Sequence, residues 1–330
     1  MQLGGQKPPL GVVFDCDMGN VGSALALAML FGFQGKNESR VISVSISRSS
    51  LAAAAFTEVL TRFYLGEPGP FGPGNLPIGV TEGGKLTGDP PMAAPVLARQ
   101  TPDGKPQYSR GIRKWNDTAE PDALIRNAYS AQYDQNAVTV LAGPATNLAA
   151  TLALPGARDL VAQKSRYLVA ALGAFPDGPP DLSATADLAA AKTLFTEWPG
   201  PIVAAGTEIG AACPFPGDSI DKDFAWSPAH PVADAYRAAK PMPYDAAAPA
   251  LAAVLYAVRP RETYFKLSDP GTLSVGGDGR VLFKPSPDGK HKYLIADPAQ
   301  KDRVLAAYTE LASTHPVPRR SFRQGQKKKQ

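Results

Sequence analysis

The sequence predicts an α/β protein with a doubly wound, mostly parallel sheet and helices on both faces. Short apolar runs of strand type alternate along the chain with longer runs in which apolar residues recur at helical spacing. Strand–helix–strand order implies right-handed parallel crossovers, which build an open sheet. Only the chain beyond residue 259 differs, because its short alternating runs, separated by Gly- and Asp-containing turns, predict a small C-terminal antiparallel hairpin element.

The first element is a strand, a tight turn and a helix. An apolar run over residues 11–14 ends at two carboxylates, Asp15 and Asp17, and a helix of small residues opens near Gly22. Cys16, between the carboxylates, is expected to point into the core. Because the chain turns where a strand ends, both carboxylates can reach the crevice at the carboxyl edge of the sheet. They would suit a hard cation or acid–base chemistry there, or they would simply cap the helix and bind loop amides.

The later elements follow the same alternation. Strands are predicted at residues 40–47, 76–80, 137–142, 166–173 and 201–206. Helices are predicted at residues 51–65, 120–133, 143–154, 188–195, 232–239 and 299–313. Residues 81–116 are rich in Gly, Pro and polar side chains without a period, so they are expected to form a long loop that is a wall or lid of the site.

Composition limits the classes of protein that this chain can belong to. Of 330 residues, 44% are hydrophobic and 19% charged, which is typical of a folded globular protein. We expect one domain over residues 1–314 and a basic tail without fixed structure over residues 315–330. That tail holds six of the Lys and Arg residues behind the net charge of +4, and nothing else in the sequence indicates nucleic-acid binding.

Targeting signals and metal-binding spacings are absent from the sequence. No apolar run reaches the roughly 18 residues that cross a bilayer, so a soluble protein without a membrane partner is expected. The first ten residues lack a signal-peptide pattern, which leaves a cytoplasmic protein or an exported one whose signal has been removed. Two cysteines form no disulfide framework. The three histidines lie outside any motif and are expected on the surface.

The opening motif carries a family resemblance. The segment DCDMGN at residues 15–20, followed by an apolar helix, resembles the first motif of the inosine-uridine nucleoside hydrolases, D-x-D-x-G-x-D-D-A-L-A. The resemblance implies that Asp17 is both a calcium ligand and the base that activates water. Gly22 and Ser23 stand where that family has an aspartate pair that binds the ribose hydroxyls and calcium. Two expected carboxylates are therefore missing.

Two later segments also resemble motifs of this family. VLAGPATNLA at residues 140–149 is similar to T-G-P-L-T-N-L-A, and the resemblance makes the carbonyl of Ala142 a calcium ligand. Asn147, in the same segment, we interpret as a capping or loop-fixing amide. At residues 241–258 the resemblance places Asp245 in the calcium shell and Tyr244 where a histidine often protonates the leaving base. A phenol is a poorer proton donor than an imidazolium at neutral pH.

A fourth segment resembles the family's ribose-binding stretch. Alignment on Asp187 and the helix after it puts Asp181 and Ser183 in the positions of a Glu and an Asn that bind ribose. Both are shorter side chains, so their hydrogen bonds need a closer backbone. Asp187 itself is interpreted as a helix N-cap. Glu208 follows the strand at residues 201–206 and is either a crevice residue or a surface glutamate.

These matches lead to two hypotheses. The first is a hydrolase that cleaves the N-glycosidic bond of a nucleoside or related ribosyl compound with metal-oriented water, using Asp17, Ala142 and Asp245 for calcium. This calcium shell is incomplete, and Asp15, Asn20 or Ser23 would have to add oxygens or contact substrate. The second is a catalytically reduced homologue that binds a sugar-like ligand without turnover. Entry of Asp181 or Glu208 into the metal shell would favour the first.

Other readings of the sequence are weaker. A dinucleotide-binding domain is disfavoured, since the first turn carries acids in place of G-x-G-x-x-G. A glycosidase with paired carboxylates is disfavoured because nothing places two acids on opposite sides of one pocket. The family resemblance also implies a homo-oligomer.

Overall fold

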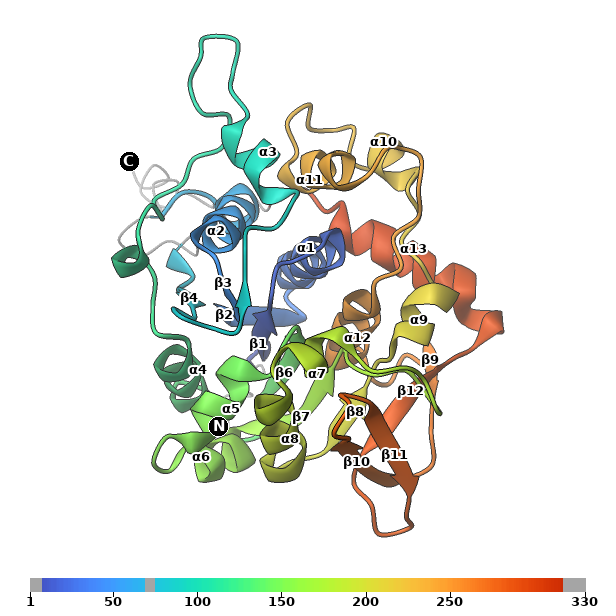
Figure 1. The fold of residues 1–330 in the computed structure, drawn as a ribbon. Helices are drawn as coiled ribbons and strands as arrows, with labels where there is room; N and C mark the ends of the chain where they lie inside the picture. Colours follow the sequence, from blue (N-terminus) through green and yellow to red (C-terminus); the bar gives the residue numbers. More distant parts are fainter. Residues whose placement is uncertain (1–7, 69–74, 317–330) are drawn as a thin grey trace, which may run out of the picture.

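A mostly parallel sheet forms the centre of the protein. The computed structural model describes residues 8–68 and 75–316 (Figure 1). The main sheet has the strand order β4-β2-β1-β6-β7-β8-β12-β9, and only the β12–β9 pair is antiparallel. Its strands are β1 (Leu10–Cys16), β2 (Ser39–Ile46), β4 (Ile78–Val80), β6 (Ala137–Ala142), β7 (Ser165–Ala170), β8 (Ile202–Ala204), β9 (Phe265–Leu267) and β12 (Lys292–Ala296). The predicted fold class is confirmed.

Helices cover both faces of this sheet (Figure 1). One face packs against α1 (Val21–Gly35), α2 (Leu51–Leu65), α11 (Pro231–Ala239), α12 (Pro249–Val258) and α13 (Lys301–Ala312). The other packs against α4 (Pro121–Ser130), α5 (Thr146–Ala153), α6 (Ala157–Lys164) and α8 (Leu188–Glu197). Strand β1 contributes side chains to the cores on both faces of the sheet, because successive side chains point to opposite faces. Val12 and Phe14 lie in the core on the α1 face, and Val13 lies in the core on the α4 face.

The order of the strands creates a switch point between β1 and β6. From β1 the chain builds outward through β2 and β4, whereas from β6 it builds the other way through β7 and β8. The connections on the two sides diverge there and leave a crevice beyond the carboxyl ends of β1 and β6. Asp17 follows β1 directly, so the motif at residues 15–20 lies at this crevice.

The C-terminal strands divide between two sheets. The predicted antiparallel hairpin is formed by β10 (Gly271–Val275) and β11 (Val281–Pro285), which pair with each other. The strands before and after it, β9 and β12, instead extend the main sheet, and β12 runs parallel to β8. An edge position on an existing sheet supplies backbone partners that a free hairpin lacks.

The long segment over residues 81–116 has more regular structure than its sequence suggests. It contains β5 (Leu86–Thr87), which pairs in parallel with β3 (Arg48–Ser49), and α3 (Ala93–Ala98), and a short 3₁₀ helix begins at its end (Trp115–Asp117). Further short helices are α7 (Leu182–Ala186), α9 (Thr207–Ala212), α10 (Ser219–Lys222) and a 3₁₀ turn at Pro298–Gln300. Local periodicity missed these elements because each is shorter than two helical turns or pairs only across the fold.

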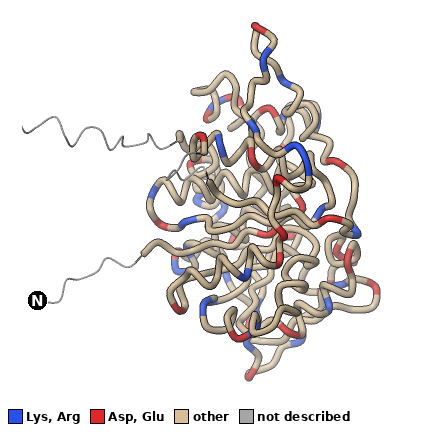
Figure 2. The backbone as a smooth tube through the Cα atoms, turned by 90° about the vertical axis from the view of Figure 1, so that its left-hand side faces the viewer, with Lys and Arg blue, Asp and Glu red and all other residues tan. Residues whose placement is uncertain are grey.

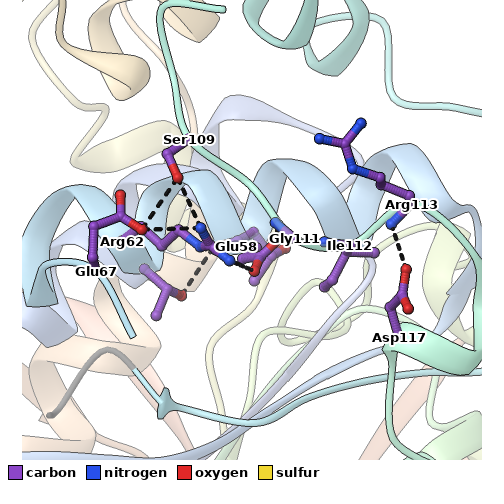
Figure 3. Close-up of polar contacts among 10 residues, drawn as sticks. Glu58, Arg62, Glu67, Ser109, Gly111, Ile112, Arg113 and Asp117 are labelled. Carbon is purple, nitrogen blue, oxygen red and sulfur yellow. Dashed lines mark hydrogen bonds and ion pairs between the residues drawn. The ribbon is translucent and has the colours of Figure 1, made fainter. Parts of the chain in front are cut away.

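A polar network fastens part of this segment to α2 (Figure 3). The Glu58 carboxylate accepts hydrogen bonds from the backbone N–H groups of Gly111 and Ile112, both at 2.7 Å. Arg62, one turn along α2, donates to Glu58 at 2.6 Å and to the hydroxyl of Ser109 at 2.7 Å. Residues 109–112 are thereby fixed to α2.

Several smaller expectations can be compared with the structure. Cys16 is fully buried, as predicted. The surface prediction is wrong for His230 and His291, which are 1% and 7% exposed. Within the described residues no helix is long and apolar enough to cross a membrane. Figure 2 shows acidic and basic positions interspersed along the backbone on the side it presents. From residue 317 onward the predicted basic tail lies outside the described residues.

Candidate functional site

A pocket of about 690 Å³ occupies the crevice at the switch point. Its lining combines polar and apolar residues. The polar lining residues are Asp17, Asn20, Ser23, Arg48, Asp181, Ser183 and Thr207. The apolar lining includes Leu86, Ala142, Pro179, Pro180, Leu182, Ala186 and the start of α12 at Ala248–Ala250. The structure therefore brings together five of the nine side chains or carbonyls predicted for the site: Asp17, Asn20, Ala142, Asp181 and Ser183.

Asp17 lies in the turn between β1 and α1. Its Oδ1 accepts from the N–H of Gly19 at 2.9 Å, and its Oδ2 accepts from Nη2 of Arg48 at 2.9 Å. Glycine at position 19 is required by close approach, since a Cβ there would lie 2.3 Å from Oδ2 of Asp17. The carboxylate is thus held in one orientation by a backbone donor and a guanidinium.

Asn20 begins helix α1 as its N-cap. Its Oδ1 accepts from the N–H of Ser23 at 3.3 Å, while its Nδ2 has no hydrogen-bond partner among the described residues. Gly22 has no room for a side chain, because a Cβ there would lie 2.6 Å from the Cβ of Ala248. Close packing of α12 on α1 thus occupies the space in which the resemblance expects an aspartate. Ser23 is 1% exposed and lines the pocket floor.

Asp15 is buried behind the pocket and does not line it. Its Oδ1 accepts from the hydroxyl of Ser45 at 2.6 Å and from Nδ2 of Asn147 at 2.8 Å, while Oδ2 is buried without a partner. Asn147 therefore ties helix α5 to strand β1, and the interpretation as a capping or loop-fixing amide is wrong. Burial raises the pKa of Asp15 to about 7; the two hydrogen bonds oppose this rise and the charge of Asp17 adds to it.

Asp181 lines the pocket, but both of its carboxylate oxygens already accept hydrogen bonds from backbone N–H groups. It caps α7 by accepting from the N–H groups of Ser183 and Ala184, both at 2.9 Å, and it also accepts from the N–H of Gly173 at 2.8 Å. Its role in the fold is therefore to join the end of β7 to α7. The hydroxyl of Ser183 faces the pocket without a side-chain hydrogen bond to any described residue. Asp187 caps α8, as predicted.

Three predicted site residues lie outside the pocket lining. Glu208 turns back to accept from the N–H of Phe175 at 3.0 Å, and burial raises its pKa. Tyr244 stacks on Tyr236 at a ring distance of 4.3 Å, and burial raises its pKa to about 12. Asp245 is exposed and accepts from the N–H of Gly217 at 2.8 Å. None of the three carboxylate or phenol groups points at Asp17.

Arg48, the pocket residue that forms an ion pair with Asp17, was not predicted from the sequence. Arg48 lies just beyond β2 and reaches Asp17 across the turn. Its position at the carboxyl end of a predicted strand was a usable signal, because side chains there meet at the same edge of the sheet. Two other lining residues were also not predicted. Leu182 is 89% exposed at the pocket rim, and Thr207 lies on the first turn after β8; only their positions in the chain could have indicated them.

The residues present do not fit the calcium ion that the resemblance implies. Calcium takes six to eight oxygen ligands. Here Asp17 already binds a guanidinium, the carbonyl of Ala142 accepts from the N–H of Asp17 at 3.4 Å, and Asp245 lies elsewhere. Across residues 8–68 and 75–316, no three His, Cys, Asp or Glu side chains gather in a way that could hold a metal ion.

Comparison with solved structures agrees with the class that the fold and crevice define. An inosine-uridine preferring nucleoside hydrolase from Bacillus anthracis matches with 16% identity over 92% of this chain and 99% of its own, at a TM-score of 0.65. A purine-preferring ribonucleoside hydrolase from Gardnerella vaginalis matches with 17% identity over 92% of this chain and 98% of its own, also at 0.65. The chain has the nucleoside hydrolase fold, and the motif resemblance is confirmed at that level.

A third structure of this fold has a different title. The type III effector protein XopQ, complexed with adenosine diphosphate ribose, matches with 12% identity over 94% of this chain and 96% of its own, at a TM-score of 0.67. No protein-family model and no curated protein matches the sequence.

Proposed function

We propose that this pocket binds a small ribosyl compound or a similar sugar-like ligand without requiring a metal. The observation that carries the proposal is the lining itself. Three polar groups of the lining make no hydrogen bond to any described residue: the Nδ2 amide of Asn20, the hydroxyl of Ser183 and the hydroxyl of Thr207. Such groups suit the hydroxyls of a sugar, which both donate and accept. The apolar lining residues suit a flat or less polar substituent.

The comparisons support the same ligand class. Two of the similar structures are named nucleoside hydrolases, and a third is titled as a complex with adenosine diphosphate ribose. Each of these names contains a ribosyl compound as substrate or ligand. The pocket of this chain lies at the switch point of the sheet, where an open α/β fold binds small molecules.

Calorimetric titration with inosine, uridine, adenosine and adenosine diphosphate ribose tests this proposal. We expect binding of at least one of them with equal affinity in calcium and in chelator. Ser183→Ala should weaken that binding about threefold or more, because it removes one hydrogen bond. Ser286→Ala is the control, since Ser286 is a half-buried serine outside the pocket. Absence of binding by all four at millimolar concentration would refute the proposal.

Hydrolysis of the N-glycosidic bond is the second candidate function. It is favoured by one observation, the presence of the Asp17 carboxylate in the pocket of a nucleoside hydrolase fold. In this case Asp17 would accept the proton of an attacking water. Release of free base from inosine or uridine, at a rate that Asp17→Asn reduces by two orders of magnitude or more, would establish it. Binding without base release would leave the pocket as a ligand-binding site only.

A further inference from the structure

We infer that Arg48 is a built-in counter-cation that replaces a metal ion at Asp17. The guanidinium neutralises the carboxylate and at the same time holds the segment that covers one side of the pocket. Arg48 is thus a positioning residue, and the pocket keeps its shape without an added cation. This inference goes beyond the proposed function and is independent of the ligand that the pocket accepts.

The contacts of Arg48 with the turn are direct. Nη2 donates to Oδ2 of Asp17 at 2.9 Å, and Nε donates to the backbone carbonyl of Asp17 at 3.3 Å. Two donors of one planar group therefore bind the same residue, which fixes its side chain and backbone together. The side chains of Arg48 and Asp17 are 16% and 13% exposed, so solvent screens the pair only partly.

The third nitrogen of the guanidinium holds residues 86–88, which we call the strap. Nη1 donates to the carbonyls of Thr87 and Gly88, at 3.1 and 3.3 Å. The backbone of Arg48 also pairs with Leu86, and the Leu86 side chain lines the pocket. One arginine consequently connects the Asp17 turn on one element to a wall of the pocket on another.

The far side of this segment is tied more weakly. Lys85, next to the strap, donates to Asp187 at 3.0 Å, and Asp187 also accepts from the hydroxyl of Thr146. The Lys85 side chain is 62% exposed, so this ion pair contributes little. Among side chains, Arg48 is thus the one that binds the strap directly, while the strap backbone pairs with β3 and the adjacent Asp89 accepts from the hydroxyl of Ser50 at 2.6 Å.

Geometry and charge both oppose a metal at this position. A Cβ on Gly19 would lie 2.6 Å from Nη2, so the guanidinium already packs directly on the turn. A divalent ion beside Asp17 would have to displace it or approach a fixed positive charge, and one carboxylate is a poor site for calcium. The counter-cation is thus supplied by the chain itself.

Calcium response of the full chain is the first test. After treatment with chelator, calorimetry with CaCl2 should give no binding heat up to millimolar concentration, and the unfolding midpoint should be equal in EDTA and in CaCl2. A micromolar site would instead raise the midpoint by several degrees. A calcium-induced rise that Asp17→Ala abolishes would overturn the inference.

Variants of the pair provide the second test. Arg48→Gln, which removes the charge and shortens the side chain, should lower the unfolding midpoint by roughly 5 °C, and Arg48→Lys, which keeps the charge, should restore part of this loss. Asp17→Asn combined with Arg48→Gln should cost less than the sum of the single changes, because the two groups stabilise each other. Arg237→Gln is the control, since Arg237 and its partner Asp221 are 46% and 65% exposed.

Hydrogen exchange supplies a readout that general destabilisation would not reproduce. Backbone amides around residues 86–88 should exchange faster in Arg48→Gln under native conditions, and those of the distant β10–β11 hairpin should not. Additive single changes, or equal midpoints for Arg48→Gln and Arg48→Lys, would overturn the inference. If Arg48→Gln does not fold, the calcium comparison on the unmodified chain decides. Failure of all ribosyl ligands to bind would refute the proposed function and leave these measurements unaffected.

Discussion

The buried carboxyl of Asp15 predicts a specific dependence of stability on pH. Burial raises its pKa from the ordinary 3.8 to about 7 in the folded protein. Between these values the unfolded chain has lost the proton and the folded chain keeps it. The contribution of Asp15 to stability is therefore complete below about pH 4 and is lost as the pH rises toward 7.

The magnitude follows from the two pKa values. Their difference corresponds to about 4 kcal/mol in total, of which about 3 kcal/mol falls between about pH 5 and pH 8. Asp15→Asn should remove this dependence, because the amide resembles the protonated carboxyl. Its oxygen can accept from Ser45 and Asn147, and its NH₂ group replaces the Oδ2 atom that has no partner. Below about pH 4 the variant should thus be close in stability to the unmodified protein.

Urea unfolding at a series of pH values measures this effect. The free energies of unfolding of the protein and of Asp15→Asn should converge at low pH and separate in favour of the variant as the pH rises. Asp288→Asn, in an exposed turn, controls for the chemical change. Parallel curves for the protein and Asp15→Asn across this range would refute the reasoning, since they would mean that Asp15 titrates alike in both states.

Three further predictions concern the rest of the fold. Burial lowers the pKa of His230 to about 3, so stability should fall by up to about 4 kcal/mol as the pH drops from about 6.5 toward 3; His230→Asn should flatten this slope in urea unfolding. Glu58→Gln should cost about 2–3 kcal/mol in urea unfolding, because Arg62 loses the less exposed of its two carboxylate partners, Glu58 and Glu67. Lys85→Gln should cost under about 1 kcal/mol yet speed hydrogen exchange over residues 82–89, since its ion pair with Asp187 is largely exposed.

Clear outcomes would contradict each of these. An unchanged acid slope in His230→Asn would show that the folded protein protonates this ring. Full stability of Glu58→Gln would show that Arg62 does not depend on the charge of Glu58. Unaltered exchange in Lys85→Gln would show that its ion pair with Asp187 does not restrain residues 82–89. Lys284→Gln is the control for the last of these, since Lys284 is an exposed lysine on another element, β11.

Local patterns in the sequence were sufficient for the fold. Strand β6 and helix α2 begin and end where their apolar runs do, because buried parallel strands and amphipathic helices have distinct periods. The strap, α7 and the pairing of β12 with β8 were not predictable in this way. Those elements are short, and partners distant in the sequence stabilise them.

Position along the chain predicted the site in part. The turn after β1 and the carbonyl after β6 reach the pocket because parallel strands end at one edge. Position could not tell which way a side chain turns after the strand has ended. Asp15 ends up beneath Asn147, and Asp245 folds onto the N–H of Gly217, because each finds a donor there.

The sequence by itself determined the α/β architecture, the motif turn at the switch point and the absence of the aspartate pair at Gly22 and Ser23. Only the tertiary structure decided what stands in its place. Helix α12 fills the space beside Gly22, and Arg48, 31 residues beyond Asp17, supplies the positive charge. A carboxylate in a partly buried crevice needs a partner, and the sequence does not state which of many cations the fold will bring to it.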